Sequence, residues 1–167
     1  MLLKHVLTTS CGIAYDTGHK DVTYNGLTKR ILLSNIARIF DPIGFLNPIT
    51  IHGRLLVQEA MDCSYIWDAK LPSEFEVRWM DIVDLLKEAL VIPIPCWIGL
   101  DPYSKLSLHS FTDSSDKALG AVVYLVSPKS RVFISSKAKV CPIKMAHFKV
   151  PKKELTAKAL GTRHLFL

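Results

Sequence analysis

The 167-residue sequence has few cysteines and places them far apart. The four, Cys11, Cys63, Cys96 and Cys141, form no C-x-x-C pair and stand near no histidines at zinc-ligand spacing. This argues against a zinc knuckle and against a dense disulfide framework. We therefore expect a reducing, intracellular setting, in the cytoplasm or the nucleus.

Long hydrophobic runs, internal repeats and low-complexity segments are also missing. The first apolar stretch contains Lys4 and His5, and the later run "ALVIPIPCWIGL" is broken by Pro93 and Pro95. Neither stretch is typical of a signal peptide or a membrane span, so we expect no membrane partner. The hydrophobic content of 49% and the mean hydropathy of +0.24 nevertheless predict a generous core, or an apolar surface that a partner covers.

Acidic residues are nearly missing from Lys129 to Arg163. This segment has ten Lys or Arg against one acid, Glu154, a balance of +9, so the rest of the chain carries −3 of the net +6. Such asymmetry is typical of a surface that binds a polyanion, although a solvated basic face remains an alternative. The candidate nucleic-acid contacts are Lys137, Lys139, Lys152 and Lys153.

The first hundred residues predict a β-hairpin followed by helices. Ile13 and Tyr15 before "DTGHKD", with Val22 and Tyr24 after it, alternate as two short strands. The segment "TKRILLSNIARIF" has helical spacing through Leu32, Ile36, Ile39 and Phe40, and "DPIGFLNP" ends it. A second helix is predicted from Pro48 to about Cys63.

The third predicted helix has the strongest signals. In "LPSEFEVRWMDIVDLLKEAL", Ser73 and Glu76 have capping-box spacing. Its apolar face comprises Phe75, Trp79, Ile82, Val83, Leu86 and Leu90. Pro93 and Pro95 close the helix, and we expect a domain boundary near Asp101.

After this boundary the pattern alternates. The stretches "KLSLHSFTD", "GAVVYLV" and "RVFISSKAKV" predict an antiparallel three-strand meander. A helix is predicted from Pro151, with Leu155, Ala159 and Phe166 toward the core.

Two candidate sites compete. Asp16 belongs to "DTG", the tripeptide of aspartic peptidases, whose chemistry needs two carboxylates that share a proton. However, His19, Lys20 and Asp21 follow at once, and the same residues are typical of a hairpin turn. A peptidase therefore stays an alternative.

The second candidate site contains Asp113, at the end of a predicted strand, and Glu154, in the first turn of the last helix. A carboxylate on a buried strand requires a compensating partner, and a metal ion would supply one. A meander, a helix and two carboxylates correspond to the opening half of a ribonuclease H fold, where carboxylates hold divalent ions. We therefore predict Asp113 and Glu154 as catalytic residues and Mg²⁺ ligands.

The order of motifs resembles the Pao/BEL retrotransposon Pol polyprotein, between the end of reverse transcriptase and the start of ribonuclease H. The similarity covers nearly the full length and is carried by "TKRILLSNIARIFDPIGFLNPITI", "WDAKLP" and "LHSFTDSSDKALGAVVYL". It implies contact with RNA:DNA hybrid, a two-Mg²⁺ site that includes Asp113 and Glu154, and a longer polyprotein that also contains integrase. One departure is "PKKEL", where the family has a Pro-Arg-Leu-Glu-Leu-like helix start.

Together these features predict an α/β chain with an N-terminal hairpin, a helical connection region and an incomplete ribonuclease H-like domain, at residues 1–27, 28–100 and 101–167. Further active-site carboxylates are expected beyond Leu167, so the isolated chain is expected to be inactive. A non-catalytic nucleic-acid-binding remnant is the other alternative.

Overall fold

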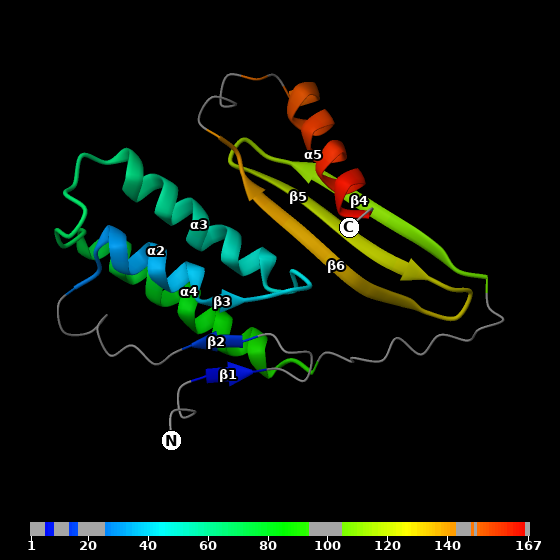
Figure 1. Cartoon of the computed structure of the whole chain (residues 1–167), viewed down its shortest axis with the longest axis horizontal. Helices are drawn as coiled ribbons and strands as arrows, with labels where there is room; N and C mark the ends of the chain where they lie inside the picture. Colours follow the sequence, from blue (N-terminus) through cyan, green and yellow to red (C-terminus); the bar gives the residue numbers. More distant parts are fainter. Residues whose placement is uncertain are drawn as a thin grey trace. The chain divides into compact units, whose positions relative to one another are not determined.

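The computed structural model describes residues 6–8, 14–16, 26–93, 105–142, 148 and 150–165. It divides into two compact units, one of residues 1–42 and 52–96 and one of residues 43–51 and 97–167 (Figure 1). The three-part division expected from the sequence stays a prediction. No described helix combines the length and the apolar character needed to cross a membrane.

The first unit combines helices with a small antiparallel sheet of order β1-β2-β3. The strands are β1 (Val6–Thr8), β2 (Ala14–Asp16) and β3 (Ile39–Phe40), and the helices are α2 (Lys29–Ala37), most of α3 (Asn47–Asp62) and α4 (Ser73–Val91). Both edges of β2 are occupied, by β1 and β3. The second strand expected for its hairpin, near Val22 and Tyr24, lies outside the described residues.

The Thr28–Arg30 motif stabilises this unit through three separate contacts. The Thr28 hydroxyl accepts the Ile31 N–H at 3.2 Å and so caps α2. The buried Lys29 donates to the carbonyl of Cys63 at 2.8 Å, just after α3. Arg30 pairs with Asp68 at 2.6 Å. The motif is therefore structural in this unit.

Two details of the helices differ from the sequence predictions. The first helix ends at Ala37, and Phe40 lies in β3 with 60% of its surface exposed. The apolar face of α4 is confirmed, but its capping box is wrong: Pro72 is the N-cap, with no side-chain cap. Glu76 instead accepts the N–H of Leu27 at 3.0 Å. Its carboxylate therefore makes a tertiary hydrogen bond and does not cap α4.

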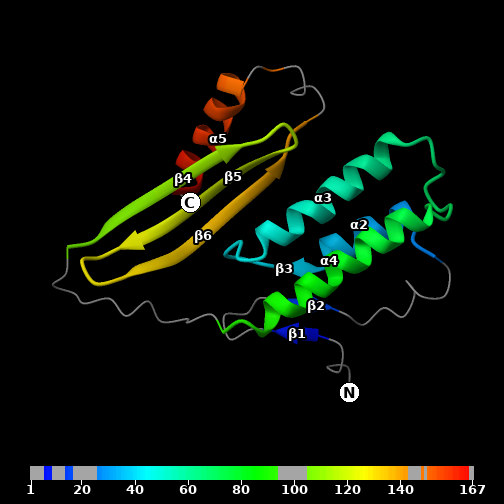
Figure 2. The same cartoon turned by 180° about the vertical axis from the view of Figure 1, so that it is seen from behind.

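The second unit contains the predicted antiparallel meander. Its strands are β4 (Ser107–Ser114), β5 (Ala118–Val126) and β6 (Arg131–Val140), paired in that order, with a bulge at Val123/Tyr124. Helix α5 (Val150–Leu165) covers one face of this sheet, as the two opposite views show (Figures 1 and 2). The arrangement is a partial ribonuclease H-like α/β fold.

Residues 43–47 pack on the sheet face opposite α5. The N–H of Ser136 donates to the carbonyl of Ile43 at 2.8 Å, and its hydroxyl donates to the carbonyl of Gly44 at 2.6 Å. The Asn47 amide donates to the Ser136 carbonyl at 3.0 Å, and the ring of Phe45 meets that of Phe133 edge-on. The "DPIGFLN" stretch therefore does more than end a helix, because it also anchors the chain to β6.

The core face of α5 is not the predicted one. Leu155 is 67% exposed and Ala159 is also exposed, while Phe166 lies outside the described residues. The helix instead turns Lys153, Ala157 and Gly161, spaced four residues apart, toward the sheet. Small side chains at two of these positions let α5 approach β4 and β5 closely, and this outweighs the hydrophobicity of Leu155.

We expect Gly161→Ala to destabilise the second unit by about 1–2 kcal/mol. Alanine favours a helix by about 1 kcal/mol, but a Cβ here would overlap the Thr112 methyl group, and overpacking costs about 1–3 kcal/mol. Urea unfolding measures the difference. Adding Thr112→Ser, which removes that methyl group, should restore stability to the Gly161→Ala chain. A Gly161→Ala chain more stable than the wild type would contradict this packing.

Candidate functional site

Asp113 is the penultimate residue of β4, and its side chain is exposed. One carboxylate oxygen accepts the N–H of Ser114 at 2.8 Å. Thr112 lies under α5, against Gly161, so strand alternation turns Asp113 to the other face. The expectation that Asp113 is buried is therefore wrong, because its side chain is exposed; metal binding by Asp113 stays a prediction.

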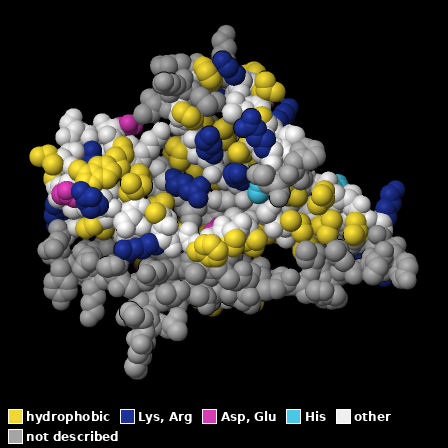
Figure 3. Space-filling model, viewed as in Figure 1, with side chains coloured by type: hydrophobic (Ala, Val, Ile, Leu, Met, Phe, Trp, Pro, Cys, Tyr) yellow, Lys and Arg dark blue, Asp and Glu magenta, His cyan; other side chains and the backbone are white. Residues whose placement is uncertain are grey.

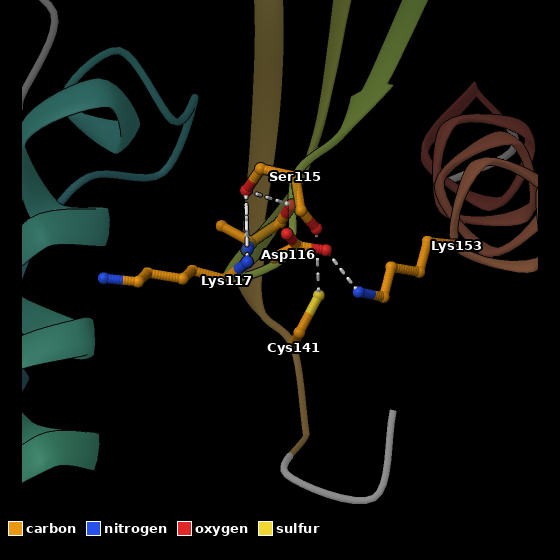
Figure 4. Close-up of polar contacts among 6 residues, drawn as sticks. Ser115, Asp116, Lys117, Cys141 and Lys153 are labelled. Atoms are coloured by element: carbon orange, nitrogen blue, oxygen red, sulfur yellow. Dashed lines mark hydrogen bonds and ion pairs between the residues drawn. The ribbon is translucent and has the colours of Figure 1, made fainter. Parts of the chain in front are cut away.

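The turn after Asp113 is tightly hydrogen-bonded. The N–H of Ser115 donates to the carbonyl of Ala118 at 2.8 Å, and the Ser115 hydroxyl accepts the N–H groups of Lys117 and Ala118. The N–H of Cys141 donates to the carbonyl of Lys117 at 2.8 Å. Local Ser-turn bonding and the end of β6 thus fix the position of Asp116 (Figure 4).

Lys153 reaches from α5 to this turn, and its ammonium lies 2.6 Å from the Asp116 carboxylate (Figure 4). The side chain of Lys153 is 4% exposed and that of Asp116 is 88% exposed. The hydrogen bond from Lys153, followed by its charge, lowers the pKa of Asp116. Burial raises the pKa of the neighbouring Cys141 thiol, an effect that the Lys153 charge opposes.

Glu154 is exposed and has no hydrogen-bond or ion-pair partner among the described residues. Because α5 begins at Val150, Glu154 is its fifth residue rather than part of its first turn, which corrects the sequence prediction. Glu154 precedes Gly161 by two helical turns and shares its side of the helix. Gly161 faces Thr112 and Ser110 of β4, so Glu154 lies on the β4 flank of α5.

Asp113 and Glu154 both stand next to the Lys153–Asp116 pair in the sequence, Asp113 on the sheet face away from α5 and Glu154 on α5 itself. Asp113 is three residues before Asp116, and Glu154 follows Lys153, the partner of Asp116. Strand β4 is the edge of its sheet, and we call the end of β4 together with the first half of α5 the β4 edge. Unlike Asp116, both carboxylates lack a cationic partner within the described part of the chain, a state that suits a hard divalent cation. No group of three or more potential metal ligands occurs among the described residues.

The predicted nucleic-acid contacts divide into two classes. Lys137, Lys139 and Lys152 are exposed, and the Lys152 ammonium lies 3.7 Å from the centre of the Phe148 ring. Lys153 differs from the expectation, because it is buried and paired with Asp116. Its charge is thus already engaged inside the protein.

Asp16, the candidate peptidase residue, is the last residue of β2 and pairs with Val6 of β1. This places it in a strand rather than in the expected turn. Thr17 and Gly18, which complete the tripeptide, lie outside the described residues.

A groove of about 700 Å³ on the sheet face opposite α5 was not anticipated. Its lining includes Asp113 beside the aromatic rings of Phe45, Phe111, Tyr124 and Phe133. Adjacent pairs of these rings meet edge-on at 6.1 Å between centres. In the sequence, the alternation of Phe111 with Thr112 could have indicated an aromatic face of the sheet. The part of the groove wall that residues 43–51 form could be seen only in the tertiary fold.

Comparison with known proteins identifies the family of this chain. The family model described as "Pao retrotransposon-like RNaseH-like domain" matches residues 28–166. Among solved structures, the foamy viral protease-reverse transcriptase in complex with dsDNA is 17% identical, with a TM-score of 0.48 over 94% of this chain. The match spans 33% of that protein's chain. No curated protein matches the sequence. The chain belongs to the family of Pao retrotransposon-like RNaseH-like domains.

Proposed function

We propose that this retrotransposon domain binds RNA:DNA hybrid and supplies Asp113 and Glu154 to a Mg²⁺-dependent ribonuclease H site. The observation that carries the proposal is the pair of exposed carboxylates at the β4 edge, without cationic partners among the described residues. Asp116, only three residues from Asp113, is by contrast neutralised by Lys153. The wider partner is the Pol polyprotein, with reverse transcriptase before this segment and the remaining ribonuclease H and integrase after it.

The proposed roles differ between the carboxylates and the lysines. Asp113 and Glu154 provide carboxylate oxygens, the ligands that Mg²⁺ prefers, and the Ser114 N–H fixes one oxygen of Asp113. Bound divalent ions would activate water and stabilise the leaving oxygen of the phosphodiester. The exposed Lys137, Lys139 and Lys152 attract the phosphate backbone without reading its sequence.

Two carboxylates provide too few oxygen ligands to hold a pair of divalent ions. We therefore expect the 167-residue chain to bind hybrid without cleaving it. Further carboxylates would come from the segment that follows in related polyproteins.

The test compares cleavage by the chain itself with cleavage by a chain extended with that following segment, using labelled RNA:DNA hybrid and Mg²⁺. Only the extended chain should cut the RNA strand. In it, Asp113→Asn and Glu154→Gln should each abolish cleavage and leave hybrid binding in EDTA nearly unchanged, because they remove metal ligands rather than phosphate contacts.

The matched control is the double substitution Asp116→Asn/Lys153→Met, which removes a third carboxylate together with its partner and should retain cleavage. Full activity of either single variant would remove that residue from the site. Cleavage by the 167-residue chain would show that its own carboxylates suffice.

A further inference from the structure

The charged side chains of α5 lie on two different flanks. We propose that Lys152 and Arg163 of α5 join Lys137 and Lys139 of β6 in one phosphate-contact strip, from which Lys158 is excluded. This inference rests on the proposed binding of hybrid and names the surface that performs it. It also distinguishes four cations at defined positions from a general excess of positive charge over the whole chain.

The orientation of α5 follows from its contacts with the sheet. Gly161 faces Ser110 and Thr112 of β4. His164 lies across the contact face from Gly161 and near Lys137 of β6. Burial and the charge of Lys137 lower the pKa of His164, which disfavours a positive charge on its ring. One flank of α5 therefore faces β4 and the other faces β6.

Helical spacing then assigns each cation to a flank. Lys152 and Thr156 are four residues apart, and Arg163 follows Thr156 by seven, so the three form one row on the β6 flank. Thr156 is half-buried at the margin of the contact face, whereas Lys152 and Arg163 are exposed. Lys158 follows Glu154 by four residues and thus shares the β4 flank.

The two lysines of β6 lie on the same face of the sheet as α5. Lys139 pairs with Leu119 and Lys137 pairs with Ala121, and directly opposed residues share a face. Leu119 packs with Ala157, and Ala121 adjoins Gly161. Lys139 therefore lies level with the first half of α5, and Lys137 lies level with the second half.

The four cations form a strip roughly 16 Å long, from eleven residues at about 1.5 Å each. Figure 3 shows Lys and Arg side chains gathered over this part of the molecule. The described carboxylates of the second unit are Asp113, Asp116 and Glu154. Asp113 lies on the opposite sheet face, Asp116 is paired with Lys153, and Glu154 lies on the other flank of α5. None of them neutralises the strip.

A row of like charges without counter-charges is relieved by a polyanion. A nucleic-acid backbone provides regularly spaced phosphates over this length, and each lysine or arginine that contacts a phosphate releases counterions. Lys152 is further positioned by the ring of Phe148, at 3.7 Å, which reduces the freedom lost on binding. The strip therefore suits phosphates of one strand.

The test measures the affinity of the 167-residue chain for fluorescent RNA:DNA hybrid by anisotropy between 25 and ~200 mM NaCl, in EDTA. The variants are Lys152→Gln and Arg163→Gln, with Lys158→Gln as the matched control, because it removes the same charge from the same helix. Each strip variant should reduce the slope of log affinity against log salt by about 0.9. The control should leave it unchanged. Thermal melts verify that all three variants fold.

Equal slope losses in all three variants would mean that net charge alone drives binding, and unchanged slopes in the strip variants would mean a solvated face; each result overturns the strip. Either pattern leaves the binding of hybrid standing. Absence of binding by the wild-type chain at the lowest salt overturns both the strip and the proposed hybrid binding.

Discussion

Gly44→Ala is expected to destabilise the second unit by about 3 kcal/mol or more. Gly44 has φ +77°, where a residue with a Cβ is strained by about 1–3 kcal/mol. A Cβ at this position would also overlap the backbone carbonyl of Ser136. That carbonyl belongs to β6 and cannot rotate away, so relief requires the segment to move off the sheet. The hydrogen bonds of Ser136 with Ile43 and Gly44 would then be lost.

Urea unfolding, followed by hydrogen exchange at the Ser136 amide, measures this effect. The matched control is Gly120→Ala in β5, because a Cβ there meets nothing within 4 Å. Glycine inside a strand costs roughly 0.5–1 kcal/mol relative to alanine, so the control should be neutral or slightly stabilising. Similar stabilities for the two variants would contradict a required glycine in the anchor of residues 43–47.

The sequence predicted elements whose periodicity is strong. The buried face of α4 and the antiparallel meander of β4 to β6 follow from side-chain spacing, and both appear in the structure, with alternating burial along β5. The second helix was predicted from Pro48 and begins at Asn47. These elements were predictable because the hydrophobic pattern of each one agrees with its own geometry.

The face of α5 could not be predicted in this way. Hydropathy favours Leu155, whereas the structure buries Ala157 and Gly161 and extends the aliphatic stem of Lys153 beneath the helix. The buried face of α5 depends on how closely the helix approaches Thr112. That distance cannot be inferred from the sequence of the helix alone. For the same reason Ser73 and Glu76 predicted a cap, while Glu76 binds Leu27 instead.

The candidate site shows the same division. Residue type and order suggested Asp113 and Glu154 as candidates, a choice that stays a prediction, whereas their surroundings required three-dimensional contacts. The buried Lys153 shows this clearly, since the sequence presents it as one more basic residue beside Lys152. Its pairing with Asp116 separates structural charge from charge that remains available to a ligand.

The pair of Lys153 and Asp116 should make stability depend on acid pH. Lys153 lowers the pKa of Asp116, so the pair stabilises the folded state above the ordinary pKa of aspartate, about 4. This contribution is lost as pH falls through the lowered pKa of the folded state. Lys153→Met removes it and keeps an apolar stem of similar length.

At pH 7 we expect Lys153→Met to be neutral or stabilising, because replacing a buried charge by a packed apolar side chain often is. Asp116→Asn should instead lower the melting temperature markedly, since it leaves a buried ammonium without a carboxylate. The double variant should recover the stability of Lys153→Met. Melting curves between pH 7 and pH 2 should then fall less steeply below pH 4 for Lys153→Met than for the wild type. Identical acid slopes in the two proteins, or an Asp116→Asn chain as stable as Lys153→Met, would show that the ion pair contributes nothing and that the stem of Lys153 alone holds α5 to the β4–β5 turn.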